Sequence, residues 1–110
     1  MGSPAVGEVV LVPFPFSDLS QAKVRPALCL ADAGRGDWVL CQITSNPFGD
    51  PIAARLSNGD FAKGSLKIES FARPSKLFTA HVSLLVGNVG ALKSNALNRV
   101  LKAVIALFQK

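Results

Sequence analysis

The stretch from Pro13 to Ala31 constrains the fold of this 110-residue chain more than any other. An apolar run ends in alternating proline and phenylalanine, a polar loop covers residues 17–23, and a second apolar run starts at Val24. Pro26 has no N–H to give to a β-ladder, so the second strand should start at a sheet edge or at a bulge. The pattern predicts two short strands joined by a polar loop, and binding and catalytic residues are often found on such loops.

The other apolar runs are equally short, and breaker residues such as glycine, proline and asparagine separate them, which is typical of strands and turns. We expect strands at residues 7–14, 24–31, 37–44, 52–56, 65–72 and 84–90. We expect a tight turn at residues 33–36, a loop at residues 46–51 and an Asn-Gly hairpin turn at residues 57–60. Residues 77–83 are ambiguous and are compatible with a short helical turn.

The end of the chain has a helical period. After Ser94, a good helix N-cap, one apolar stripe consists of Leu97, Val100, Leu101, Val104, Ile105 and Phe108. Short strands followed by one amphipathic helix predict a mainly β fold with a C-terminal α-helix. The architecture should be an SH3-like small barrel or a strongly curved antiparallel sheet. Residues 1–110 should form one domain, with a flexible N-terminus at residues 1–6.

Composition narrows the class of protein. Nearly half of the residues are hydrophobic, which disfavours disorder, and no apolar run approaches the ~18 residues of a membrane helix. The N-terminus lacks the basic start and apolar core of a secretory signal, so we expect a soluble, cytoplasmic protein. The net charge of +5 fits a polyanion such as nucleic acid or an acidic protein. A mildly basic protein without such a partner explains the charge equally well.

The chain has two cysteines and one histidine. Cys29 and Cys41 fall in strands expected to be neighbours, so a cross-strand disulfide is one alternative. The favoured one is that both are small buried hydrophobes of a reduced protein. Neither the cysteines nor His81 have the spacing of metal ligands, and we predict no metal and no cofactor.

Arg25 and Thr44 are the first candidates for chemistry. If residues 24–31 and 37–44 form a hairpin, the start of one strand lies beside the end of the other, and both side chains share a rim. A guanidinium can hold a phosphate and stabilise charge that develops on it, and a threonine hydroxyl can donate to a phosphate oxygen. On position alone, two alternatives remain: Arg25 could form an ion pair with Asp18 or another carboxylate, and Thr44 could be an ordinary residue at the end of a strand.

A second polar cluster contains Arg73, Ser75 and Lys76, whose cations could follow a phosphate backbone or form a solvated basic surface. Phe48 and Trp38 could stack on bases, although packing in the core or a loop is the favoured interpretation of both. His81 has no placed partner and is weak evidence for acid–base catalysis.

The order of these motifs resembles the PemK/MazF-like toxins of toxin–antitoxin systems. The resemblance runs from about Gly7 to the C-terminal helix. It rests on the opening strand with its loop up to Asp18, on Arg25-Pro26-Ala27-Leu28, on Gln42-Ile43-Thr44-Ser45, and on Ser70-Phe71-Ala72-Arg73 with Lys76-Leu77-Phe78-Thr79. Each motif alone is weak, but four in order are fairly specific.

The resemblance implies a homodimeric toxin that cleaves single-stranded RNA or mRNA at short sequences without a metal, and that a cognate acidic antitoxin blocks. In the reaction it implies, a 2′-hydroxyl attacks the adjacent phosphate and leaves a cyclic phosphate. Arg25 and Thr44 match the catalytic positions. The residues expected to bind RNA are Asp18, Gln21, Lys23, Ser45, Asn46, Arg73, Ser75 and Lys76.

The chain departs from the family at two positions. Many relatives have an aspartate where Ser75 stands, and some have an acid at the position of His81. If that acid acts as a base or orients the substrate, this protein should cleave more slowly, cleave at different sequences, or be inactive as a nuclease. Two alternatives remain open. One is a non-catalytic toxin on the same scaffold, like the CcdB-type toxins that poison gyrase, and the other is an SH3-like domain of different function.

Overall fold

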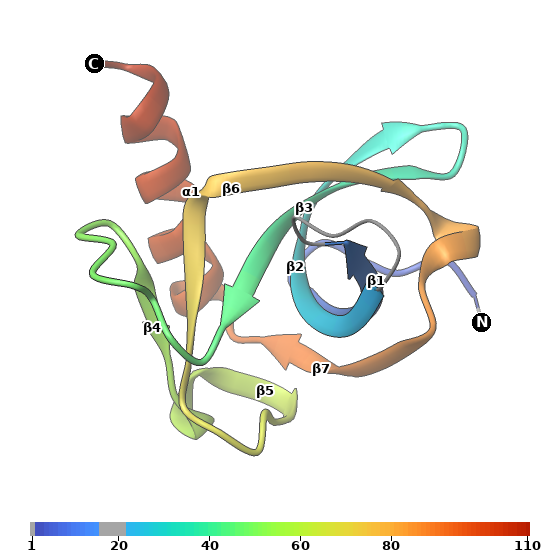
Figure 1. Cartoon of the computed structure of the whole chain (residues 1–110), viewed down its shortest axis with the longest axis horizontal. Helices are drawn as coiled ribbons and strands as arrows, with labels where there is room; N and C mark the ends of the chain where they lie inside the picture. The colour runs from blue at the N-terminus through green and yellow to red at the C-terminus, as the bar shows by residue number, and fades with distance from the viewer. Residues whose placement is uncertain (1, 16–21) are drawn as a thin grey trace.

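The computed structural model describes residues 2–15 and 22–110, which form a mainly β structure with one α-helix (Figure 1). The strands are β1 (Glu8–Pro15), β2 (Ala22–Gly34), β3 (Asp37–Thr44), β4 (Ala54–Leu56), β5 (Phe61–Gly64), β6 (Ser70–His81) and β7 (Gly87–Leu92). Two short 3₁₀ helices, η1 (Asn58–Asp60) and η2 (Val82–Leu84), and the C-terminal helix α1 (Ser94–Phe108) complete the fold. The predicted mainly β fold with a C-terminal helix is confirmed.

All strand pairs are antiparallel, and the sheet order is β4-β6-β3-β2-β1-β7-β5. The two edge strands, β4 and β5, are joined by only residues 57–60. A connection this short between opposite ends of a seven-stranded sheet requires the sheet to curl until its edges meet. Figure 1 shows this curl, with β6 arching over β1 and β2 and β7 passing below them.

The curled sheet buries apolar side chains on both faces, because neighbouring residues of a strand point to opposite sides. On β1, Val9 belongs to the cluster that includes Ala96 and Val100 of α1, whereas Val10 belongs to the cluster with Trp38 and Leu40. All six side chains are buried. The helix covers one face, and the curl of the sheet encloses the other.

The strand β6 turns a corner at a large bulge (Figure 1). Its pairing with β3 passes from Ala72 opposite Ile43 to Leu77 opposite Cys41, so residues 73–76 all face the single residue Gln42. Pro74 inside the bulge is fully buried, and the Cys41 thiol donates a hydrogen bond to the Arg73 carbonyl at 3.1 Å. The bulge therefore fixes the backbone that carries Arg73, Ser75 and Lys76.

Several expected elements agree with the structure. The strands at residues 7–14 and 37–44 match β1 and β3, and the turn at residues 33–36 lies between β2 and β3. The expected strands at residues 24–31, 52–56 and 84–90 match β2, β4 and β7 with shifted ends. Of the ambiguous segment at residues 77–83, residues 77–81 belong to β6, and a helical turn, η2, begins at Val82.

Three expectations were wrong. The Asn-Gly pair at residues 58 and 59 lies in η1 and not in a hairpin, because Asp60 folds back to accept a hydrogen bond from the Ser57 amide at 2.9 Å. The strand expected at residues 65–72 begins later, at Ser70, and continues as β6 to His81, so residues 65–69 lie outside any strand. The short strand β5 was not predicted. Ser94 is the first residue of α1, and its predecessor Lys93 occupies the N-cap.

Cys29 and Cys41 are both free and buried. Cys29 pairs with Leu40, and Cys41 pairs with Leu28, so the two sulfurs point to opposite faces of the sheet. Burial raises the pKa of each thiol to about 12. The expectation of small buried hydrophobes is confirmed, and the disulfide is excluded.

In the part of the chain that the structure describes, no helix has the length and apolar character needed to span a membrane.

Candidate active site

Arg25 and Thr44 stand where β2 and β3 separate. The ladder between these strands begins at Ala27 opposite Gln42, and N-terminal to this pair β2 continues against β1 alone. Pro26 is the first residue beyond the ladder, and it has no N–H with which to extend it. β2 begins earlier than expected, at Ala22, and stays paired with β1 through Pro26, but its first residues form an open edge toward β3, as expected. A cleft lies there, between the start of β2 and the end of β3.

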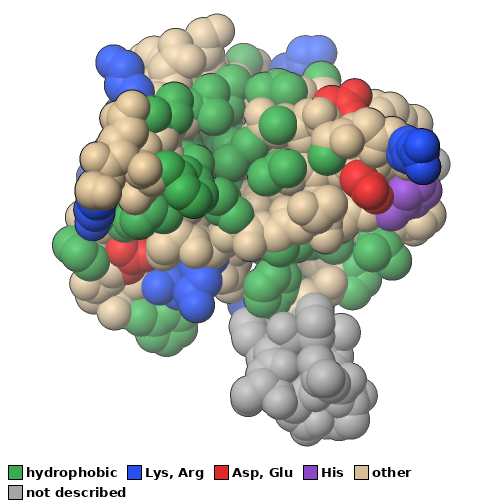
Figure 2. Space-filling view, turned by 90° about the horizontal axis from the view of Figure 1, so that it is seen from above, with side chains coloured by type: hydrophobic (Ala, Val, Ile, Leu, Met, Phe, Trp, Pro, Cys, Tyr) green, Lys and Arg blue, Asp and Glu red, His purple; other side chains and the backbone are tan. Residues whose placement is uncertain are grey.

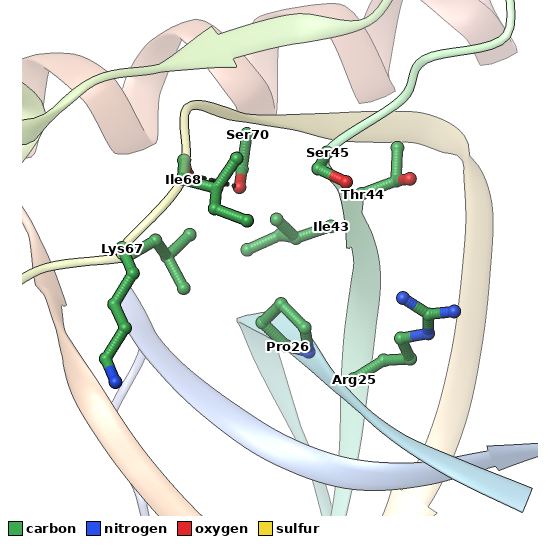
Figure 3. A pocket seen from close by; sticks show the side chains of 9 residues that line it. Arg25, Pro26, Ile43, Thr44, Ser45, Lys67, Ile68 and Ser70 are labelled. Atoms are coloured by element: carbon green, nitrogen blue, oxygen red, sulfur yellow. Dashed lines mark hydrogen bonds between the residues drawn. The ribbon is translucent and has the colours of Figure 1, made fainter.

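Two adjoining cavities occupy this cleft, with volumes of about 210 and 190 Å³. Arg25, Thr44 and Ser45 line both, so the predicted proximity of Arg25 and Thr44 is confirmed. Figure 3 shows the Arg25 guanidinium extending toward the end of β3, with Lys67 on the opposite side of the larger cavity. The Lys67 ammonium points away from the guanidinium in this view, so Arg25 is the cation placed to meet a phosphate in the cleft.

The Thr44 hydroxyl closes a local turn. Its oxygen accepts a hydrogen bond from the Asn46 amide at 3.1 Å, and its proton is donated to the Asn46 carbonyl at 3.0 Å. These bonds hold Ser45, which is exposed, on the rim of both cavities. Thr44 therefore shapes the rim as well as presenting an oxygen to the cavity.

Arg73 forms the most buried ion pair of the described residues. Its Nε lies 3.0 Å from Asp50 Oδ2, and the side chains of Arg73 and Asp50 are 17% and 6% exposed. Asp50 Oδ1 also accepts a hydrogen bond from the Ile52 amide at 3.0 Å. This bond and the Arg73 guanidinium hold the pKa of the Asp50 carboxyl below its usual value of 3.8. The Arg73 guanidinium carbon lies 5.9 Å from the centre of the Phe48 ring, which places the cation over the aromatic face.

The other predicted site residues are spread more widely. Asn46 lines the smaller cavity, while Lys23, Ser75 and Lys76 are exposed but line neither cavity. Lys23 precedes Arg25 by two residues on β2 and shares its face. Asp18 and Gln21 lie outside the described residues.

Sequence reasoning missed three members of the site. Lys67 and Ser70 were placed on a regular strand, although the chain at residues 65–69 leaves the sheet and lines the larger cavity. Asp50 was treated as part of a breaker-rich loop, because no local pattern connects it with Arg73, 23 residues further on. Within the described residues, no group of three or more His, Cys, Asp or Glu side chains is placed to hold a metal ion.

The model of the PemK-like, MazF-like toxins of type II toxin–antitoxin systems matches residues 5–108, which is nearly the whole chain. The chain belongs to this family. No curated protein sequence is similar enough to match it.

Solved structures of toxins share the fold. One is MazF in a MazE–MazF crystal structure from Deinococcus radiodurans, with 19% identity, a TM-score of 0.78, and coverage of 99% of this chain and 98% of that one. Another is an endoribonuclease in complex with its cognate antitoxin from a mycobacterial species, with 14% identity, a TM-score of 0.74, and coverage of 99% and 96%. A third is the Mycobacterium tuberculosis toxin MazF-mt6, with 18% identity, a TM-score of 0.67, and coverage of 91% and 96%.

The Asp50–Arg73 pair of this toxin should make its stability depend on acid. Because the folded state lowers the pKa of Asp50, the stabilisation is complete above the unfolded value near 3.8 and is lost as pH falls through the folded value. At pH 7, Asp50→Asn should lower the free energy of unfolding by about 1–3 kcal/mol, the range for a hydrogen bond to a charged group. Chemical denaturation between pH 7 and pH 2 should show the difference shrinking below about pH 4.

The exposed pair of Arg55 and Glu69 offers the control. Glu69→Gln should change stability by no more than about 1 kcal/mol, because solvent screens an exposed pair. An Asp50→Asn variant as stable as the parent at pH 7 would contradict a structural role for this carboxylate.

Proposed function

We propose that this toxin is a metal-independent endoribonuclease that cleaves single-stranded RNA at short sequences in the cytoplasm. The observation that carries the proposal is the cleft in which Arg25 and Thr44, from two separating strands, line the same cavities. The family match supports it, because proteins of the same fold include toxins described as endoribonucleases. The net charge of +5 suits an RNA substrate.

Arg25 is the residue that stabilises charge in this proposal. It is half-buried between the strands, where its charge is less screened by water than that of an exposed lysine. The 2′-hydroxyl loses its proton to water as its oxygen bonds to phosphorus, and the 5′-oxygen takes a proton from water as its bond to phosphorus breaks. Negative charge gathers on the non-bridging oxygens between these two events. The guanidinium fork of Arg25 binds these oxygens, and one of its N–H groups hydrogen-bonds to the leaving oxygen.

Thr44 positions the phosphate. Its hydroxyl proton now goes to the Asn46 carbonyl and would turn toward a phosphate oxygen in the complex, while the oxygen keeps the Asn46 amide. The residues that line the two cavities, as far as the structure describes them, include no carboxylate and no histidine to take the proton of the 2′-hydroxyl. Ser75 stands where many relatives carry an acid, so we expect this toxin to rely on charge stabilisation more than on a general base.

Replacing Arg25 tests the mechanism directly. Arg25→Ala should lower the cleavage rate of a single-stranded RNA by roughly 10²–10³, the scale seen when a donor to the transition state is removed. Arg25→Lys should restore little, because a point charge cannot reproduce the fork. Thr44→Val, which keeps the shape but removes the hydroxyl, should also slow cleavage. The assay is gel analysis of a long RNA in excess EDTA, and thermal melts check that each variant is folded.

The same assay separates the proposal from its alternative. A parent protein that leaves RNA intact in EDTA but inhibits a DNA topoisomerase would be a non-catalytic toxin on this scaffold. Cleavage by Arg25→Ala within about twofold of the parent, with the fold intact, would remove Arg25 from the mechanism.

We propose that the protein forms a twofold homodimer. Several large apolar side chains away from the cleft are exposed, among them Leu84, Val86, Ile105 and Phe108. Figure 2 shows apolar side chains gathered on the face that lies uppermost in Figure 1, where β6 and α1 run. Light scattering at micromolar concentration should give twice the mass of one chain, and a monomer would count against the dimer.

We also propose that an acidic segment of a cognate antitoxin binds across the cleft. Similar structures include toxins in complex with their antitoxins, and the charge of +5 would attract an acidic segment. The association rate should then fall at least about tenfold between about 0.05 and 0.5 M salt, as electrostatic steering is screened. Stopped-flow mixing measures this rate, and a rate indifferent to salt would exclude steering.

A further inference from the structure

Phe48 is an exposed aromatic ring in an unusual backbone conformation. Its side chain is 73% exposed, and its φ of 54° lies in the left-handed region, which a bulky non-glycine residue adopts only under strain. Exposing an apolar ring to water is unfavourable, and an exposed ring adds no packing contacts to the hydrophobic core. The strained backbone and the exposed ring do not stabilise the free protein, and a ligand that binds the ring would account for both.

The loop that carries Phe48 is tightly bonded. Asn46 Oδ1 accepts a hydrogen bond from the Phe48 amide at 3.0 Å, and the Asp50 amide donates to the Pro47 carbonyl at 2.9 Å. Asp50 in turn holds Arg73, and the Arg73 guanidinium lies over the Phe48 ring. The ring is therefore fixed by its own backbone and by a cation that is anchored to a buried carboxylate.

The ring stands beside the proposed reaction centre. Phe48 lines the smaller cavity together with Arg25 and Thr44. Arg73 occupies one face of the ring, and the high exposure of Phe48 leaves the rest of its surface open to a ligand. A nucleotide whose phosphate sits at Arg25 would bring a neighbouring base within reach of this surface.

We propose that Phe48, backed by Arg73 and Asp50, is a stacking platform for one nucleobase next to the scissile phosphate. The proposal rests on the proposed RNA cleavage and adds to it the group that positions the strand. Bases stack well on aromatic faces, and a guanidinium on the far side adds a favourable contact without demanding a particular base. Phe48 thereby sets the register of the RNA, while Arg25 and Thr44 act on the phosphate.

The test measures binding without cleavage. The probe is a short single-stranded RNA that carries a mapped cleavage sequence with 2′-O-methyl riboses, which cannot attack the phosphate. Phe48→Ala should weaken binding roughly 5- to 100-fold, the range expected for loss of one base stack. Phe48→Leu, which keeps apolar bulk but has no aromatic face, should weaken it similarly, and Phe48→Trp should preserve it.

The chain provides a matched control. Phe108 near the end of α1 is 74% exposed and lines neither cavity of the cleft. Phe108→Ala should leave the affinity for RNA unchanged. The oligomeric state of this variant is measured in parallel by light scattering. Because both phenylalanines are exposed, neither alanine variant should lower the melting temperature by more than a few degrees.

Removing one base at a time from the RNA completes a double-mutant cycle. One abasic position should weaken binding to the parent and have no further effect on Phe48→Ala, because the missing partners are the same pair. Additive effects at every position would overturn the platform. So would an Ala variant that binds RNA like the parent but loses affinity for the antitoxin, because the ring would then belong to that interface.

The outcomes also separate this inference from the function on which it rests. If the parent cleaves RNA, Arg25→Ala does not, and Phe48→Ala binds RNA like the parent, only the platform fails. If the parent neither binds nor cleaves single-stranded RNA, the proposed function and the platform fail together.

Discussion

The missing N–H of Pro26 is the constraint on which the site depends. The ladder between β2 and β3 stops at Ala27, although its register, continued by two residues, would have set Arg25 opposite Thr44 in a closed sheet. With the ladder interrupted, β2 follows β1 and β3 follows β6, and the two side chains face a cleft. The stretch that defines the fold thus also opens the site.

Local patterns predicted much of this arrangement. The strand around Arg25 and the strand that ends at Thr44 follow from β-branched runs and breakers, and a hairpin between them is enough to bring the two residues together. Pairings between distant segments could not be predicted in this way. The Asn-Gly pair after Leu56 indicated a hairpin, but the serine and aspartate that flank it form a capping box, a competing signal that was present in the sequence.

The bulge in β6 shows why other parts of the site escaped prediction. Its four residues face a single residue of β3, and no periodicity in the sequence marks such an insertion. The bulge is set by tertiary contacts: the buried ring of Pro74 and the bond from the Cys41 thiol to the Arg73 carbonyl. The pairing of Arg73 with Asp50 depends on this geometry, and so does the cation over Phe48.

The cations of the proposed nuclease differ in burial, and we expect their roles to differ accordingly. Lys23 and Lys76 are exposed, so salt screens their fields beyond about 8 Å under physiological conditions, and they act chiefly on the rate of encounter with RNA. Arg73 is neutralised by Asp50 and contributes position more than charge. Arg25 is half-buried in the cleft, where a lower dielectric strengthens its interaction with a phosphate. In the proposed mechanism a modest net charge of +5 suffices, because the cation assigned to the reaction is the one that the strands partly withdraw from water.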